Sequence, residues 1–200
     1  INIVAGVTSG VVTATVTSGA ASVLKSLTTN STDAITMTVN AESSGATAAA
    51  DLVSLNANTN QVITMTAVTS VSGSYADLLD VYVTNKSQYA GVGDEAVTIT
   101  DATAVSATQA NDIANATSGI VTATIAEASA SSLNSALVDS GSQVNAYNLT
   151  ISSGSADAAD LIALDGKTSV AVNASNVGTV TGTATNVAAA YAANTAGTIT

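Results

Sequence analysis

The chain has 200 residues, of which 46% are hydrophobic but only 2% aromatic, and Phe, Trp, Pro, Cys and His are absent. This scarcity of large side chains disfavours a single globular core, and the absence of Cys excludes disulfides and thiolate metal sites. Fourteen acidic residues against three lysines give a net charge of −11, which disfavours nucleic acids and anionic membranes as partners.

Seven segments of alternating β-branched residues predict strands. In chain order they are residues 11–16, 34–39, 62–67, 96–101, 120–125, 146–151 and 170–175. Successive segments begin about 27 residues apart, which is typical of coils built from one strand and one helix or turn. Alternation gives each strand one apolar face. The residues expected on that face are Val12, Ile35, Ile63, Val97, Val121, Tyr147 and Val172.

The opposite face of the predicted strands is rich in hydroxyl groups. We expect an outward threonine ladder made of Thr13, Thr15, Thr36, Thr38, Thr64, Thr66, Thr98, Thr100, Thr122 and Thr124. The arrangement resembles the T-x-T arrays of β-helical ice-binding proteins. Coil lengths are irregular, however, and Thr is a favoured outward residue of any strand. A solvated or laterally packing face therefore explains the pattern as well.

Alanine-rich stretches between the strands carry apolar residues at helical spacing, as at residues 49–55 and 158–164. Ser74 with Asp77 and Ser106 with Gln109 have the spacing of capping boxes, and Asp165-Gly166 predicts a helix end. These signals predict short helices between the strands.

A long internal repeat organises the chain. TSGVVTATV from Thr8 recurs as TSGIVTATI from Thr117, an offset of 109 (117 − 8). The same offset relates AADLVSLN from Ala49 to AADLIALD from Ala158. Residues 1–200 are thus expected to form a single segment with about 1.8 copies of the repeat (3–111 and 112–200), as part of a longer array.

These patterns together predict an α/β solenoid. Its coils would be right-handed, with one stacked parallel strand per coil and short helices on the return side. The alternative is an all-β solenoid, a β-helix in which the alanine-rich stretches are extended arcs.

Three short motifs match known catalytic or nucleotide-binding patterns only in part. Ser22 and Lys25 have the S-x-x-K spacing of penicillin-recognising enzymes, but the repeat replaces Lys25 by Asn134. Residues 166–168 lack the first glycine of a phosphate-binding loop. The G-x-G-x-x-A of residues 91–96 precedes a predicted strand where a dinucleotide site needs a helix. We therefore expect no enzyme activity, no catalytic residues and no organic cofactor.

Calcium is the one cofactor for which the sequence offers candidate ligands. Asp94, Glu95 and Asp101 flank one turn and strand start, and carboxylate oxygens suit this ion. The alternative is that these side chains only solvate the surface.

Several sequence segments resemble repeat units of very large secreted or cell-surface proteins of marine cyanobacteria and other aquatic bacteria. Among them are GVGDEAVTITDATAVSATQAN, TSGIVTATIAEAS and DAADLIALDGKTSVAVNASNVGTVTGTA. The resemblance implies an extracellular structural role, as a segment of a fibre, filament or surface layer that associates with itself or with further repeats. The alternative is a binding module for ice or glycans, or a calcium-dependent adhesin. Neither reading requires insertion into a membrane.

Overall fold

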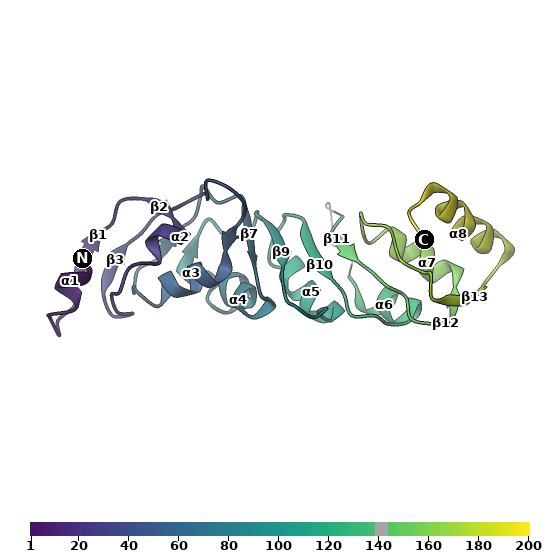
Figure 1. Ribbon diagram of the computed structural model, residues 1–200, viewed down its shortest axis with the longest axis horizontal. Coiled ribbons are helices and arrows are strands. Elements are labelled where there is room, and N and C mark those ends of the chain that lie inside the picture. The colour runs from purple at the N-terminus through teal and green to yellow at the C-terminus, as the bar shows by residue number, and fades with distance from the viewer. Residues whose placement is uncertain (139–143) are drawn as a thin grey trace. The chain divides into compact units, whose positions relative to one another are not determined.

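The computed structural model describes residues 1–138 and 144–200 (Figure 1). They divide into two compact units. The first unit comprises Ile1–Thr100 with Ala116–Gly119, and the second comprises Asp101–Asn115 with Ile120–Thr200.

The first unit alternates short strands with short helices. Its strands are β1 (Thr13–Thr15), β2 (Gly19–Ala20), β3 (Ala34–Thr36), β4 (Val39–Asn40), β5 (Thr47–Ala48), β6 (Ile63–Thr64), β7 (Ser70–Gly73), β8 (Tyr89–Ala90) and β9 (Ala96–Ile99). Its helices are α1 (Asn2–Ala5), α2 (Ala21–Leu24), α3 (Ala49–Asn56) and α4 (Tyr75–Leu79), followed by the π-helical η1 (Asp80–Thr84) and the 3-10 turn η2 (Lys86–Gln88).

The second unit follows the same alternation with longer helices. Its strands are β10 (Val121–Thr124), β11 (Ala146–Asn148), β12 (Gly154–Asp157) and β13 (Val177–Thr181). Its helices are α5 (Ala107–Ala114), α6 (Ala130–Ala136), α7 (Ala158–Asp165) and α8 (Ala184–Ala196).

Strand pairing is parallel in both units. In the first unit β1 pairs with β3, β2 with β4, β6 with β8, and β7 lies between β5 and β9. Helix α3 packs on β5 and β7 (Figure 1). In the second unit β10 pairs with β11 and β12 with β13, and α7 contacts β12 and α8. The protein is therefore α/β with several short parallel sheets.

The predicted solenoid is wrong, because the seven predicted strands do not form one continuous stack, although β1 pairs with β3 and β10 pairs with β11. Residues 62–67 contribute only the two-residue β6, which pairs with β8, whereas β9 pairs with β7. Segments 34–39 and 62–67 share a single bridge, Thr38 to Thr64, and segments 146–151 and 170–175 share only the bridge from Thr150 to Asn173. The strands are instead divided among several short sheets.

The unequal spacing of the segments explains this difference. The longest interval, 34 residues between positions 62 and 96, holds β7, α4, η1, η2 and β8. Extra strands within an interval, such as β7 and β8, form backbone hydrogen bonds with the predicted strands. In a continuous stack the predicted strands would have formed these hydrogen bonds with each other. The all-β alternative is also wrong, because helices occupy the alanine-rich stretches.

Local predictions of helices and caps are confirmed. Helices α3 and α7 cover the two predicted alanine-rich stretches, and α7 ends at Asp165 with Gly166 as its C-cap. The Ser74 hydroxyl accepts a hydrogen bond from the Asp77 amide, and Ser106 with Gln109 forms a complete capping box. These interactions depend only on residues within a few positions of each other, so sequence spacing is sufficient to predict them.

The predicted apolar face is confirmed for six of its seven residues. Val12 is half-buried, and the buried residues are Ile35, Ile63, Val97, Val121, Tyr147 and Val172. The core of each unit is therefore built from aliphatic side chains of strands and helices, with few aromatic rings.

A similar hydrogen bond from a backbone amide to a side-chain oxygen is found at the start of β1 and at the start of β10. The Asp33 carboxylate accepts the Val12 amide at 2.7 Å, and the Asn145 side-chain oxygen accepts the Val121 amide at 2.8 Å. Hydrogen bonds from the backbone amides of Asn30 and Val12 lower the pKa of Asp33. An acceptor side chain one residue before β3, and another one residue before β11, thus orients the start of β1 and of β10.

A pH dependence follows from Tyr147. Burial raises the pKa of Tyr147 from 10.0 to about 12, and the hydrogen bond from Asn145 partly opposes this shift. Because the unfolded chain ionises at lower pH than the folded chain, the contribution of Tyr147 to stability is intact below pH 10 and is lost as the pH rises towards 12. Urea denaturation at a series of pH values measures this loss. The Tyr147→Phe variant is expected to lose less stability across the same window, and an equal loss in both proteins would contradict this expectation.

Candidate functional site

The acidic turn, residues 91–95, is built around the carboxylate of Glu95. Glu95 is fully buried, and its Oε2 accepts hydrogen bonds from the amides of Gly93 at 2.8 Å and Asp94 at 3.2 Å. Gly91 and Gly93 have φ values of 87° and 123°, which other residues rarely adopt. The glycines therefore allow the turn to fold its own amides onto the carboxylate.

Tyr82, on η1, donates the third hydrogen bond to Glu95 Oε2, at 3.2 Å. Burial, followed by the nearby negative charges of Glu95 and Asp94, raises the pKa of Tyr82 far above its usual value. The tyrosine therefore stays protonated and serves as a donor, which fixes the acidic turn against η1.

A second turn, TSG at residues 117–119, packs against the acidic turn. The Thr117 hydroxyl donates to the Glu95 carbonyl oxygen at 2.8 Å, and the Ser118 amide donates to the Gly93 carbonyl oxygen at 2.8 Å. A Cβ atom at Gly119 would lie 2.1 Å from the Glu95 carbonyl oxygen. Only glycine fits this close approach between two backbones.

The first repeat carries the same TSG turn at residues 8–10. The Gly10 amide donates to the Thr8 hydroxyl at 3.1 Å, as the Gly119 amide does to Thr117 at 3.0 Å. All three residues of the turn at 8–10 are exposed, and a Cβ atom at Gly10 would meet only its own Thr8 hydroxyl, at 3.5 Å. The two turns thus share their internal structure but differ in what covers them.

The proposed calcium ligands lie in different environments. Asp94 is exposed and Glu95 is engaged inside the first unit, whereas Asp101 is exposed and belongs to the second unit. Within the described ranges, no group of three or more His, Cys, Asp or Glu side chains is placed to hold a metal ion. Calcium binding at these residues stays a prediction. Sequence reasoning missed the inward role of Glu95, for which the two preceding glycines were the available signal.

All ten threonines of the predicted ladder are exposed or half-buried. Thr15 lies opposite Thr36, and Thr38 lies opposite Thr64. Other pairs set a threonine against another residue type, as in Thr13 with Ala34, Thr98 with Ser72 and Thr124 with Asn148. The threonines therefore do not face one another throughout these strand pairs.

The residues of the S-x-x-K motif contact different carboxylates. The Ser22 hydroxyl donates to Glu42 at 2.6 Å, and Lys25 forms an ion pair with Asp51 at 3.0 Å. In this arrangement Lys25 does not activate Ser22.

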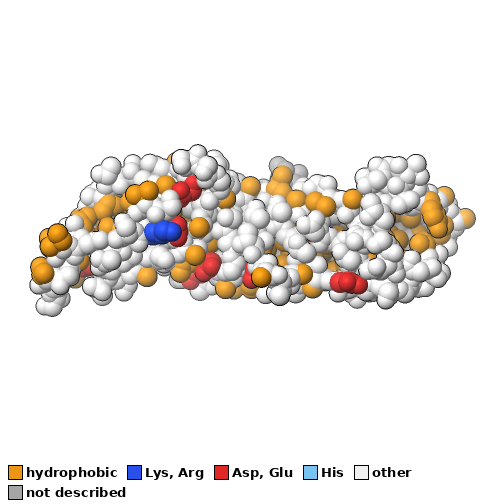
Figure 2. Space-filling model, viewed as in Figure 1, with side chains coloured by type: hydrophobic (Ala, Val, Ile, Leu, Met, Phe, Trp, Pro, Cys, Tyr) orange, Lys and Arg blue, Asp and Glu red, His pale blue; other side chains and the backbone are white. Residues whose placement is uncertain are grey.

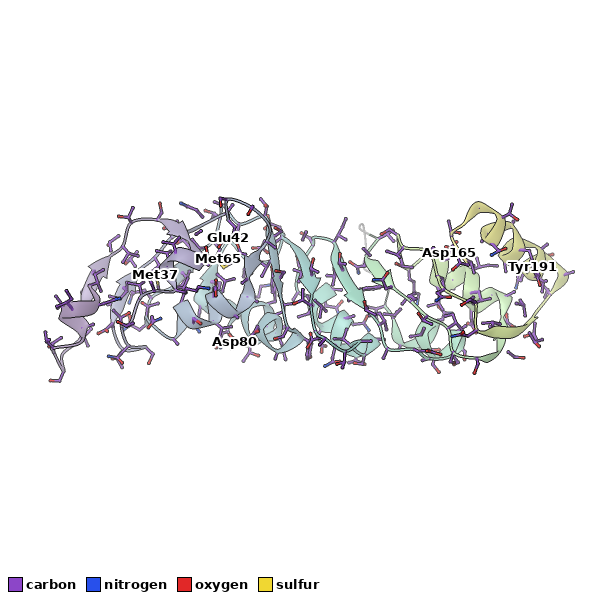
Figure 3. All side chains as sticks on the ribbon, in the orientation of Figure 1. Met37, Glu42, Met65, Asp80, Asp165 and Tyr191 are labelled. Atoms are coloured by element: carbon purple, nitrogen blue, oxygen red, sulfur yellow. The ribbon has the colours of Figure 1, made fainter. Side chains whose placement is uncertain are left out.

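A pocket of about 210 Å³ opens in the second unit between β13, α7 and α8. It is lined by Leu161, Ala174, Val177, Val180, Ala190, Tyr191, Asn194, Ile199 and Thr200. Tyr191 projects from α8 with 61% of its surface exposed (Figure 3). Figure 2 shows hydrophobic side chains at the surface in this region. The lining offers apolar contacts and few polar groups, which suits a peptide side chain better than a charged ligand.

No helix in residues 1–138 and 144–200 combines the length and hydrophobicity that a membrane span requires. Comparison with known proteins found no matching family model, curated protein or solved structure.

Proposed function

We propose that this chain is a structural segment of an extracellular or cell-surface fibre, filament or surface layer. It acts by association between repeat copies and not by catalysis. The observation that carries the proposal is the internal repeat, since β7 and β13 lie 109 residues apart and pair in the same register with β5 and β12. Each copy also contains a TSG turn with the same internal hydrogen bond, and a preformed turn that loses little conformational entropy on docking favours association.

Exposed apolar residues next to the free turn support the same proposal. Ile3 and Val7 are 84% and 83% exposed, and Val4 and Val11 are also exposed. Figure 2 shows hydrophobic side chains gathered over α1. Contiguous apolar side chains beside a hydrogen-bonding turn are typical of a surface that another protein segment covers. The resemblance to repeats of large cell-surface proteins supports the extracellular setting.

The charge of the chain bears on the conditions for association. A net charge of −11 repels neighbouring copies at low ionic strength. Divalent cations screen this repulsion, and calcium is abundant outside cells, so we expect millimolar Ca²⁺ to promote association even without a dedicated calcium site.

Sedimentation velocity of the full chain over a wide concentration range, with and without Ca²⁺, tests the proposal. Electron microscopy of the same samples would identify filaments or sheets. The Gly10→Val variant is expected to weaken association, because its side chain blocks the exposed turn without meeting the rest of the protein. Ala57→Val, at the exposed end of α3, is the matched control and should associate like the parent. A chain that stays monomeric under every condition contradicts the proposal.

A further inference from the structure

Five asparagines of the chain stand in the N-x-S/T sequon that N-linked glycosylation requires. They are Asn30, Asn85, Asn115, Asn148 and Asn173. A chain this rich in Asn, Ser and Thr contains sequons by chance, so the sequon alone assigns no site. A glycosyl transferase must reach both the asparagine amide and the hydroxyl group two residues later. The structure around each sequon therefore decides which of them an enzyme can use.

The sequon Asn30-Ser31-Thr32 lies between α2 and β3, and all three of its residues are exposed. Two hydrogen bonds to Asp33 hold the backbone here. The Asn30 backbone amide donates to Asp33 Oδ2 at 2.9 Å, and the Asp33 amide donates to the Asn30 carbonyl oxygen at 2.9 Å. Within the described ranges, no hydrogen bond engages the Asn30 side chain or the Thr32 hydroxyl. Both groups that the reaction requires are therefore free.

Two of the other sequons have one of these groups engaged. Asn85 is half-buried, and its side-chain amide donates to Asp80 Oδ2 at 2.8 Å. Thr117, two residues after Asn115, is half-buried, and its hydroxyl donates to the Glu95 carbonyl oxygen at 2.8 Å. Each of these hydrogen bonds must break before an enzyme can bind the sequon.

The remaining two sequons belong to paired backbone segments. In the sequon at residues 148–150, Leu149 is only 2% exposed and Thr150 is bridged to Asn173. The Asn173 amide donates to the Leu149 carbonyl oxygen at 2.9 Å, and the Ser175 hydroxyl donates to the Asn173 side-chain oxygen at 2.7 Å. An enzyme can bind either sequon only after these segments separate.

We propose that Asn30 is the acceptor of an N-linked glycan. This inference rests on the extracellular setting of the proposed function, because transferases of this class act on secreted chains. In the reaction, Asn30 Nδ2 attacks the anomeric carbon of an oligosaccharide that is carried on a lipid diphosphate. The new C–N bond replaces the C–O bond to phosphate, the lipid diphosphate leaves, and the amide proton passes to a base of the transferase.

The folded chain can carry the product at this position. Backbone atoms and the Asp33 carboxylate hold the segment at residues 30–33, so a glycan on the Asn30 side chain breaks none of these hydrogen bonds. Strand β3 begins only at Ala34, which leaves its pairing with β1 unchanged. The exposed neighbours Ser31 and Thr32 leave room for a bulky, hydrated glycan.

Glycosyl transfer to the purified, folded full chain tests this inference. The enzyme is a single-subunit oligosaccharyltransferase that accepts N-x-S/T without further sequence requirements, supplied with an oligosaccharide on a lipid diphosphate. Mass spectrometry of the intact chain and of its peptides identifies the modified residues. We expect the folded chain to gain one glycan, on Asn30, whereas synthetic peptides containing each of the five sequons are all modified.

Variants of the same sequon provide the controls. Asn30→Gln and Thr32→Ala should both abolish the modification of the folded chain, whereas Thr32→Ser keeps the hydroxyl group and should still be modified. Asn115→Gln should leave the glycan on Asn30 unchanged. Thermal unfolding confirms that the variants fold. A folded chain that stays unmodified, or that is modified mainly at another asparagine, overturns the inference.

Sedimentation of the unmodified chain separates this inference from the proposed function. A chain that associates but is not modified overturns the inference and leaves the proposed function standing. Modification of Asn30 in a chain that never associates supports the inference and contradicts the proposed function.

Discussion

Replacing Ile63 by Asp is expected to lower the free energy of unfolding by about 4 kcal/mol or more, enough to unfold much of the first unit. Ile63 lies on β6 with none of its surface exposed. Strand β6 pairs with β8 and places Ile63 opposite the buried Tyr89. A carboxylate at this position would lie in an apolar layer that offers it no cation, so the folded state must either bury the charge or open.

The matched control is Thr64→Asp, one residue further along the same strand. Thr64 is half-buried on the opposite face, where a carboxylate can reach solvent, so the expected loss is about 1 kcal/mol or less. Chemical denaturation of both variants measures the difference. Similar losses in the two variants would refute the assignment of the strand's faces.

Gly119→Ala is expected to have the second largest effect, a loss of about 3 kcal/mol. The added Cβ atom would lie 2.1 Å from the carbonyl oxygen and 2.4 Å from the carbonyl carbon of Glu95. Both atoms belong to the backbone of the acidic turn, which its own hydrogen bonds hold in place, so neither can move aside cheaply. We expect the TSG turn at 117–119 to detach from the acidic turn.

The repeat supplies the control for this variant, because Gly10 occupies the equivalent position in the exposed TSG turn. Gly10→Ala meets only the Thr8 hydroxyl, at 3.5 Å, and should change stability by about 0.5 kcal/mol or less. Thermal unfolding measures the change in stability of each variant, and hydrogen exchange of the Ser118 amide measures detachment of the TSG turn at 117–119. If Gly10→Ala destabilises the chain as much as Gly119→Ala, the close contact with Glu95 is not the cause.

Local features of this protein could be predicted from the sequence because neighbouring residues determine them. The alternation that buries Ile35, Ile63 and Val121 depends on the period of a strand, and the N-caps at Ser74 and Ser106 depend on a spacing of three residues. The 109-residue offset likewise relates equivalent strand pairs with equal register, as at Val71 and Val180.

Strand partners could not be predicted in this way. Sequence spacing indicates where a strand is but not which edge it meets, and a few extra residues between two segments suffice to introduce another strand. The solenoid prediction assumed that each segment pairs with the next, whereas β9 pairs with β7 and β6 pairs with β8. The calcium prediction required a Glu95 carboxylate that is available to an ion. Nothing in the local sequence pattern indicates that Tyr82, 13 residues earlier, donates a hydrogen bond to this carboxylate.

The sequence by itself therefore determined the α/β composition of elements, their caps, the buried faces and the repeat, all of which arise from short-range geometry or from direct self-similarity. Only the tertiary structure decided the division into short sheets, the burial of Glu95 and the different surroundings of equivalent residues. Tyr82 and Tyr191 occupy the same repeat position, yet one is fully buried and the other is 61% exposed. Burial depends on which segments are packed against a residue, and residues distant in the chain make that packing.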